Sequence, residues 1–223
     1  MTVKKLVVVT GAAGVLGRAV CTELLAKGYA VAGLDLAAFA ASDLALALPG
    51  VDLTDAESVA AAFARVAGLG PLHGLVNVAG GFRWETVIDG EVESWDFLYR
   101  INVRTALNAV RAALPLLGEG GTIVNIGAAG AVKAGTGMGA YAASKSGVAK
   151  LTESLAEELK DAGIRVNAVL PSIIDTPLNR ADMPDADFGR WVSPAALARV
   201  IEFLLSDAAA PITGALLPVT GRV

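Results

Sequence analysis

The chain has 223 residues, of which 54% are hydrophobic and 18% charged, and its net charge is −4. These values exclude a disordered chain, and a single cysteine, Cys21, excludes a disulfide scaffold. An isoelectric point near 5.1 argues against nucleic acid as a partner, and no apolar run reaches the roughly 18–20 residues of a membrane span despite a mean hydropathy of +0.58. We expect one cytoplasmic domain over residues 1–223, with no metal site.

Apolar strand-like runs alternate with helix-like segments along the chain. Strands are expected at residues 6–9, 29–34, 72–78, 122–126, 164–170 and 215–219. Helices are expected at residues 15–27, 56–66, 93–117, 139–162 and 194–205, and Pro115 should break the third of them near its end. Residues 36–50 fit neither pattern. Strands that are apolar throughout and alternate with helices indicate an α/β fold, a Rossmann-type doubly wound parallel sheet of about seven strands with helices on both faces.

Three glycines, Gly11, Gly14 and Gly17, stand where the first strand meets the first helix. Glycine permits a tight turn, and the helix N-terminus behind it offers free N–H groups to a pyrophosphate. The spacing is G-x-x-G-x-x-G, which differs from the usual dinucleotide fingerprint. The turn therefore predicts a dinucleotide site, and a purely structural glycine turn remains the alternative.

Asp35 ends the second apolar strand, where a carboxylate can accept hydrogen bonds from the adenosine ribose. A carboxylate at that point would repel the 2′-phosphate of NADP. NAD(H) is therefore the preferred cofactor, while the nearby Arg18 leaves NADP(H) open. The alternative role for Asp35 is that of a solvated loop acid.

Tyr141 and Lys145 are four residues apart on a predicted helix and so share one of its faces. An ammonium near a phenol favours the phenolate and lowers the phenol pKa, which would let Tyr141 exchange a proton while hydride moves. Taken alone, such a pair is more often an exposed helical pair.

In context, the motifs resemble the short-chain dehydrogenase/reductase family over essentially the whole chain. They are Thr10-Gly11-x-x-Gly14-x-x-Gly17, Asp35, Asp52, Asn77-Val78-Ala79-Gly80, Asn102, Tyr141-x-x-x-Lys145, Val166–Pro171 and Ile212–Leu217. The resemblance implies an NAD(P)-dependent oxidoreductase that acts on a small molecule. It also implies a homo-oligomer, dimer or tetramer, paired through the helices at 93–117 and 139–162.

The resemblance assigns roles residue by residue. Tyr141 and Lys145 would be catalytic, and Asn102 would hold a water that links Lys145 to solvent, unless it only bonds helix backbone. The cofactor would be contacted by Thr10, Gly11, Gly14, Val15, Leu16, Gly17, Asp35, Asp52, Leu53, Asn77, Ala79, Gly80, Tyr141, Lys145, Pro171, Ile174 and Thr176. Thr176 could instead be a turn residue.

Two positions depart from the family pattern. Val15 replaces a glycine of the family's usual turn, and Ala128 stands where the family has its catalytic serine. Losing one such donor typically costs about 10²–10³-fold in rate where an oxyanion develops. Either the protein is a weak or inactive member, or its substrate does not need that donor. Thr136 could substitute only if its loop folds back.

Quinonoid dihydropteridine reductases resemble this chain in keeping the tyrosine and lysine, using NADH and lacking the serine. The likeness lies in Val78–Phe82, Gly135–Met138 and residues 170–191. It predicts NADH-dependent reduction of a quinonoid dihydropteridine-like substrate. The alternatives are a general carbonyl or alcohol oxidoreductase, for example of 3-oxoacyl type, and a non-catalytic dinucleotide-binding protein.

The substrate pocket is expected in two short segments, residues 81–92 and 171–192. Its predicted residues are Gly81, Phe82, Trp84, Ala128, Met183 and Trp191. Aromatic side chains there could stack on a planar ring, or could simply pack their loops against the body. His73 and Cys21 are expected to be structural.

Overall fold

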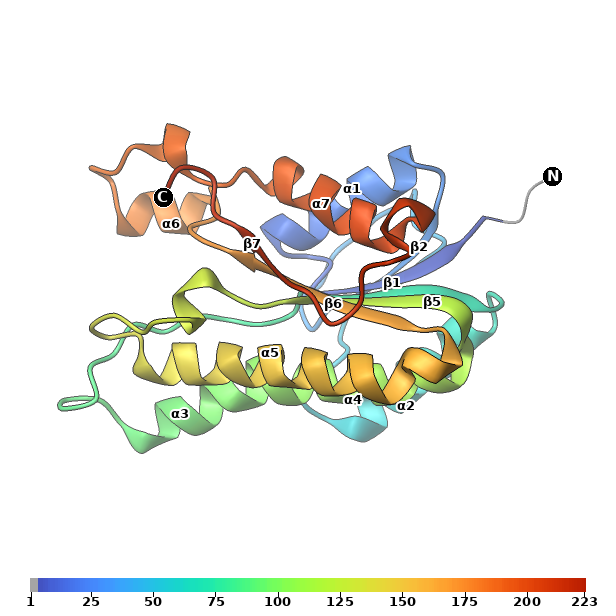
Figure 1. Ribbon diagram of the computed structural model, residues 1–223, viewed down its shortest axis with the longest axis horizontal. Coiled ribbons are helices and arrows are strands. Elements are labelled where there is room, and N and C mark those ends of the chain that lie inside the picture. The colour runs from blue at the N-terminus through green and yellow to red at the C-terminus, as the bar shows by residue number, and fades with distance from the viewer. Residues whose placement is uncertain (1–3) are drawn as a thin grey trace.

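A seven-stranded parallel sheet in the order β3-β2-β1-β4-β5-β6-β7 runs through the computed structural model, which describes residues 4–223 (Figure 1). The strands are β1 Leu6–Thr10, β2 Ala30–Leu34, β3 Leu46–Leu48, β4 Leu72–Asn77, β5 Leu117–Ile126, β6 Arg165–Pro171 and β7 Leu216–Val219. All five residues of β1 are buried, as expected of a strand covered on both faces. The predicted doubly wound fold is confirmed.

Helices cover both faces of the sheet (Figure 1). They are α1 Val15–Ala26, α2 Ala56–Ala67, α3 Val92–Tyr99, α4 Thr105–Ala113, α5 Gly139–Leu159, α6 Pro177–Asp182 and α7 Pro194–Leu205. One apolar core joins α1 and α7 to the sheet, and a second joins α2, α4 and α5 to its other face. None of these helices in residues 4–223 has the length and apolar composition needed to cross a bilayer.

The structure divides the helix that was predicted over residues 93–117. A π-helical turn, Arg100–Arg104, separates α3 from α4, and a 3₁₀ turn at Leu114–Leu116 holds Pro115. β5 then begins at Leu117, five residues before the predicted strand. Periodicity does not reveal a π turn, because the apolar pattern continues across it.

Two short elements were not predicted. β3 lies inside the ambiguous segment 36–50, and α6 lies in a segment expected to be a loop. The predicted caps are confirmed: Gly163 has φ +67° after α5, and the Ser193 hydroxyl accepts a hydrogen bond from the Ala196 N–H at 3.2 Å.

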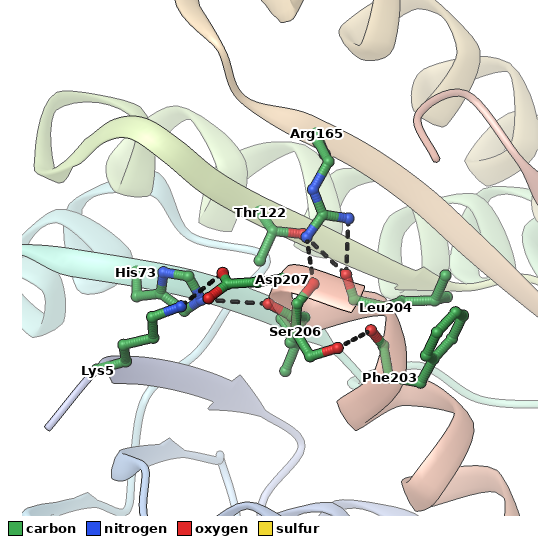
Figure 2. A network of polar contacts seen from close by, with 9 residues as sticks. Lys5, His73, Thr122, Arg165, Phe203, Leu204, Ser206 and Asp207 are labelled. Carbon is green, nitrogen blue, oxygen red and sulfur yellow. Dashed lines mark hydrogen bonds and ion pairs between the residues drawn. The ribbon is translucent and has the colours of Figure 1, made fainter. Parts of the chain in front are cut away.

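The C-terminal turn of α7 is capped by side chains from the amino-terminal ends of the strands (Figure 2). Arg165 donates to the carbonyl oxygens of Leu204 at 2.8 Å and Ser206 at 3.2 Å. His73 Nε2 lies 3.2 Å from the carbonyl oxygen of Leu205, so this bond requires the proton on Nε2. These contacts satisfy helix carbonyls that lack an intrahelical partner.

Candidate active site

A cleft of about 1210 Å³ opens at the carboxyl-terminal edge of the sheet, beyond the ends of β1, β4, β5 and β6. Open α/β sheets bind their ligands at this edge. The cleft runs from the turn between β1 and α1, past the end of β5, to the segment that follows β6. No group of three or more His, Cys, Asp or Glu side chains within residues 4–223 could hold a metal ion.

The glycines of the first turn are required by its geometry. Gly11 has φ +67°, and a Cβ on it would lie 2.8 Å from the Ala79 nitrogen. A Cβ on Gly17 would collide with the Gly11 carbonyl oxygen. Helix α1 begins at Val15, and no side chain from residues 4–223 caps its first turn. Its N–H groups are therefore available to a phosphate, so the turn fits a dinucleotide.

Asp35 is fixed against this turn. One carboxylate oxygen accepts from the Ala13 N–H at 2.9 Å and the other from the Ala37 N–H at 2.8 Å. The side chain belongs to the cleft wall. The carboxylate therefore stands where β2 ends, beside the N–H groups of the glycine turn.

Asp52 and Leu53 also lie in the cleft wall. The backbone N–H and hydroxyl of Thr54 donate to one Asp52 oxygen at 2.8 and 2.7 Å, and these bonds hold the pKa of Asp52 below its ordinary value. Leu36, Val51 and Thr54 share this part of the wall, although sequence reasoning did not select them. The signal that could have found these three residues is their position next to Asp35 and Asp52 in the sequence.

Thr10 and Asn77 are buried and do not line the cleft. The Thr10 hydroxyl accepts hydrogen bonds from the N–H groups of Val78 at 3.1 Å and Ala79 at 3.3 Å. The Asn77 amide donates to the side-chain oxygen of Asn125 at 2.9 Å. Both residues hold the ends of the strands, while Ala79 and Gly80 form the cleft wall itself.

Tyr141 and Lys145 lie together on α5 and both border the cleft. Lys145 is buried, and its ammonium donates to the Ile126 carbonyl oxygen at the end of β5, at 2.7 Å. The ring of Phe82 packs edge-on against that of Tyr141, with 4.9 Å between centroids. Tyr141 and Lys145 thus both border the cleft that begins at the glycine turn.

Burial moves both pKa values. It raises the pKa of Tyr141 to about 12 and lowers the pKa of Lys145 to about 8. The tyrosine shift is opposite to the lowering expected from the sequence, because loss of hydration outweighs any help from an ammonium that is bound to Ile126. Tyr141 is therefore a neutral phenol that keeps its proton at neutral pH.

Asn102 lies in the π-helical turn and is buried outside the cleft wall. Its side chain accepts from the Gly81 N–H at 2.9 Å and donates to the Gly81 carbonyl oxygen at 3.1 Å. It also donates to the Ser144 hydroxyl at 3.0 Å, which in turn donates to the Tyr141 carbonyl oxygen. The side chain therefore ties the segment after β4 to the helix of Tyr141.

Ala128, Phe82, Trp84 and Met183 lie where the substrate pocket was predicted, and all four belong to the cleft wall, as does Gly81. Trp191 does not line the cleft. It is buried against Phe188, with 4.8 Å between ring centroids, so it packs its loop to the body. Thr136 is also outside the wall, so its hydroxyl does not replace the one missing at Ala128.

A comparison with known protein families identifies the family of this protein. Residues 5–187 match the family described as short chain dehydrogenase. The protein is a member of that family. It is therefore an oxidoreductase of a family whose enzymes use NAD(P) and act on small molecules.

Relatives and solved structures agree with the family. The chain is 32% identical to 2-(S)-hydroxypropyl-CoM dehydrogenase 3 of Xanthobacter autotrophicus, over 97% of this chain and 95% of the relative. It is 36% identical to D-threitol dehydrogenase of Mycolicibacterium smegmatis, over 97% and 92%. The structure of aldohexose dehydrogenase from Thermoplasma acidophilum is similar at a TM-score of 0.90 and 28% identity, over 98% and 93%.

In this short-chain dehydrogenase, the segment after β6 closes the cleft. Pro171, Ile174 and Thr176 lie in the wall as predicted from the resemblance. Thr176 also caps α6, accepting from the Asn179 N–H at 3.2 Å, so its turn role and its cleft position coexist. The expected pocket segment 171–192 also contains the wall residues Ser172, Ile173, Leu178, Asn179 and Asp182, which sequence reasoning did not single out. The last three lie on α6, which was not expected.

Proposed function

We propose that this short-chain dehydrogenase interconverts a small alcohol and its carbonyl compound with NAD(H), using Tyr141 as the proton carrier. The observation that carries the proposal is the placement of Tyr141 and Lys145 on one wall of the cleft that starts at the uncapped glycine turn. The D-threitol and aldohexose dehydrogenases named above support an alcohol or carbonyl substrate.

When bound, the nicotinamide dinucleotide supplies or takes up a hydride, which carries two electrons. In reduction, the Tyr141 hydroxyl gives its proton to the substrate oxygen as the carbonyl carbon gains hydride. In oxidation, the Tyr141 oxygen takes the hydroxyl proton as the carbon loses hydride. The Lys145 ammonium, 2.7 Å from the Ile126 carbonyl oxygen, would favour the phenolate that oxidation needs once it turns from that carbonyl toward Tyr141.

Ala128 supports a second candidate substrate. Its methyl group lies in the cleft wall, at the position where the family's serine would polarise a carbonyl. A conjugated C=N acceptor, such as a quinonoid dihydropteridine, gains hydride and a proton without building an oxyanion that needs that donor. The proposal therefore includes NADH-dependent reduction of such an acceptor as its alternative.

The test is NADH consumption with a panel of ketones, aldoses, 3-oxoacyl thioesters and quinonoid dihydropterin. Turnover of ketones or aldoses supports the first candidate, and turnover of dihydropterin alone supports the second. In the Ala128→Ser variant, carbonyl reduction should rise if that missing donor limits the rate, by up to about 10²-fold. A complete absence of turnover across the panel would contradict both candidates.

Asp35 supports NAD(H) over NADP(H). Its carboxylate is fixed by two N–H groups beside the glycine turn and would repel a 2′-phosphate. We expect NADH to bind at least tenfold more tightly than NADPH, a difference of about 1.4 kcal/mol. Fluorescence titration measures both constants, and Asp35→Ser should narrow the gap. Tighter binding of NADPH by the unaltered protein would overturn the preference.

We propose that α3, α5 and the segments next to them form the contact between copies of the chain in a dimer or tetramer. Val92, Trp95 and Tyr99 of α3 expose apolar surface there, which a second copy would cover. Light scattering at micromolar concentration tests this proposal. A monomer would contradict it.

A further inference from the structure

The substrate end of the cleft has an unusual charge pattern. This end is the part of the wall formed by Gly81, Phe82, Trp84, Ala128, Ala129, Gly130, Leu178, Asn179, Asp182 and Met183. Lys145 is the one cation of the wall among the residues that the structure describes, and its ammonium is held by the Ile126 carbonyl oxygen. Asp35 and Asp52 stand at the opposite end, and Asp182 is the charged wall residue at the substrate end.

Two arginines on the flanking segments are turned to other partners. Arg83 donates to the Ser94 hydroxyl at 2.8 Å, and its guanidinium lies over the Phe97 ring, 4.8 Å from the centroid. Arg180 is bound to both carboxylate oxygens of Asp175, at 2.6 and 2.8 Å. Neither side chain belongs to the cleft wall. An anionic group bound at this end would therefore meet Asp182 without a compensating cation.

Two aromatic rings at the substrate end of the cleft are exposed to solvent. Phe82 is 53% exposed and Trp84 60% exposed, although both border the cleft. Their positions are fixed. Phe82 packs against Tyr141, and the Trp84 ring lies so close over Gly137 that a side chain there would collide with it. The Glu85 N–H also donates to the Gly137 carbonyl oxygen at 2.9 Å.

These features together describe a binding surface. Rigid, exposed aromatic rings inside a cleft are covered most favourably by a flat or apolar body. Wall residues without an available cation give no counter-charge to a carboxylate, phosphate or sulfonate. The Phe82 ring packs against Tyr141, so a body stacked on it is close to the proposed proton carrier.

We propose that the substrate end selects an electroneutral substrate with a flat apolar body, held on Phe82 and Trp84, and disfavours anionic substrates. This inference rests on the proposed function, since it assigns the substrate class of that same site. It adds Trp84 as a specificity-determining residue that touches the substrate rather than the cofactor.

A pair of isosteric probes tests the proposal without any need for turnover. Calorimetry on the NAD⁺-saturated protein compares 2-naphthamide with 2-naphthoate, which share the ring and differ in charge. We expect the amide to bind at least about tenfold more tightly. Equal affinities, tighter binding of the carboxylate, or no binding of either probe would overturn the proposal.

Variants locate the probe. Trp84→Ala should weaken 2-naphthamide binding by about three- to tenfold, the size of a lost aromatic contact. Phe203→Ala is the matched control, because Phe203 is also an exposed aromatic residue but lies on α7 outside the cleft wall. Weakening by Phe203→Ala equal to that by Trp84→Ala would contradict the assigned surface. Failure of the proposed hydride transfer would instead appear as absent NADH oxidation, so the two failures are distinguishable.

Discussion

The helix ends at the two edges of the parallel sheet differ in whether side chains cap them. At the amino-terminal edge, Arg165 and His73 bond the last carbonyl groups of α7 (Figure 2). At the carboxyl-terminal edge, α1 begins without a side-chain cap from residues 4–223, and the cleft opens in front of it. The polar groups at the amino-terminal edge bond one another, whereas the N–H groups at the start of α1 face the cleft and are, in our proposal, the ones that bind the cofactor. Substitutions at the two edges should therefore separate stability from activity.

Apart from the loss of the proposed proton carrier itself, the largest effect is expected at the glycine turn. A Gly17→Ala methyl group would collide with the Gly11 carbonyl oxygen and push apart the strand end and the helix start. We expect kcat/KM to fall by about 10²-fold, the cost of misplacing bound groups by an ångström. NADH titration and steady-state kinetics measure this. Gly68→Ala is the control, since Gly68 ends α2 with ordinary helical angles; an equal loss there would contradict the assignment.

The next prediction concerns the pH dependence of reduction. Burial lowers the pKa of Lys145 to about 8, so its ammonium is present below that pH and lost above it. We expect kcat/KM to fall about tenfold per pH unit above this value, because the profile of kcat/KM reports the free enzyme. A profile that stays flat between pH 7 and 9.5 would show that the lysine charge has no part in the reaction.

The opposite edge should respond in stability alone. Arg165→Met removes the donors to the Leu204 and Ser206 carbonyl groups and should cost about 1.5–3 kcal/mol of unfolding free energy. The kcat/KM of the folded variant should not change. Urea unfolding and kinetics on the same preparation check this, with exposed Arg65→Met on α2 as the control. A tenfold loss of kcat/KM in Arg165→Met would show that the amino-terminal edge also affects activity, and would contradict the expected separation of stability from activity.

A smaller effect is expected from His73. Burial lowers its pKa from 6.5, so the unfolded chain binds the proton more readily than the folded protein. Stability from this residue is therefore present above pH 6.5 and declines as the pH falls below it. Denaturation midpoints at pH 7.5 and 5.5, compared with His73→Gln, measure the effect. A His73→Gln variant with the same pH dependence as the unaltered protein would rule it out.

The sequence predicted the sheet well because its strands are apolar throughout and its turns carry specific glycines. Gly163 and Ser193 marked helix ends that the structure confirms. The sequence did not predict the π turn around Asn102, because the turn does not interrupt the periodic apolar pattern. It did not predict helix α6, because that short helix does not produce such a pattern. The wall residues on α6 were missed for that reason.

The direction of the side chains was the second feature that the sequence did not predict. Trp84 and Trp191 sit in similar aromatic loop segments, yet one borders the cleft and the other is buried against Phe188. The pKa of Tyr141 also depends on the burial of its hydroxyl, which the i, i+4 spacing alone does not specify.

The central claim is that Tyr141 carries the proton while hydride moves. Tyr141→Phe removes only the hydroxyl oxygen and keeps the ring that packs against Phe82. With the best substrate of the panel, kcat should fall by about 10²–10⁴-fold while the dissociation constant of NADH and the unfolding free energy stay unchanged. A variant that turns over at the rate of the unaltered protein would contradict the account.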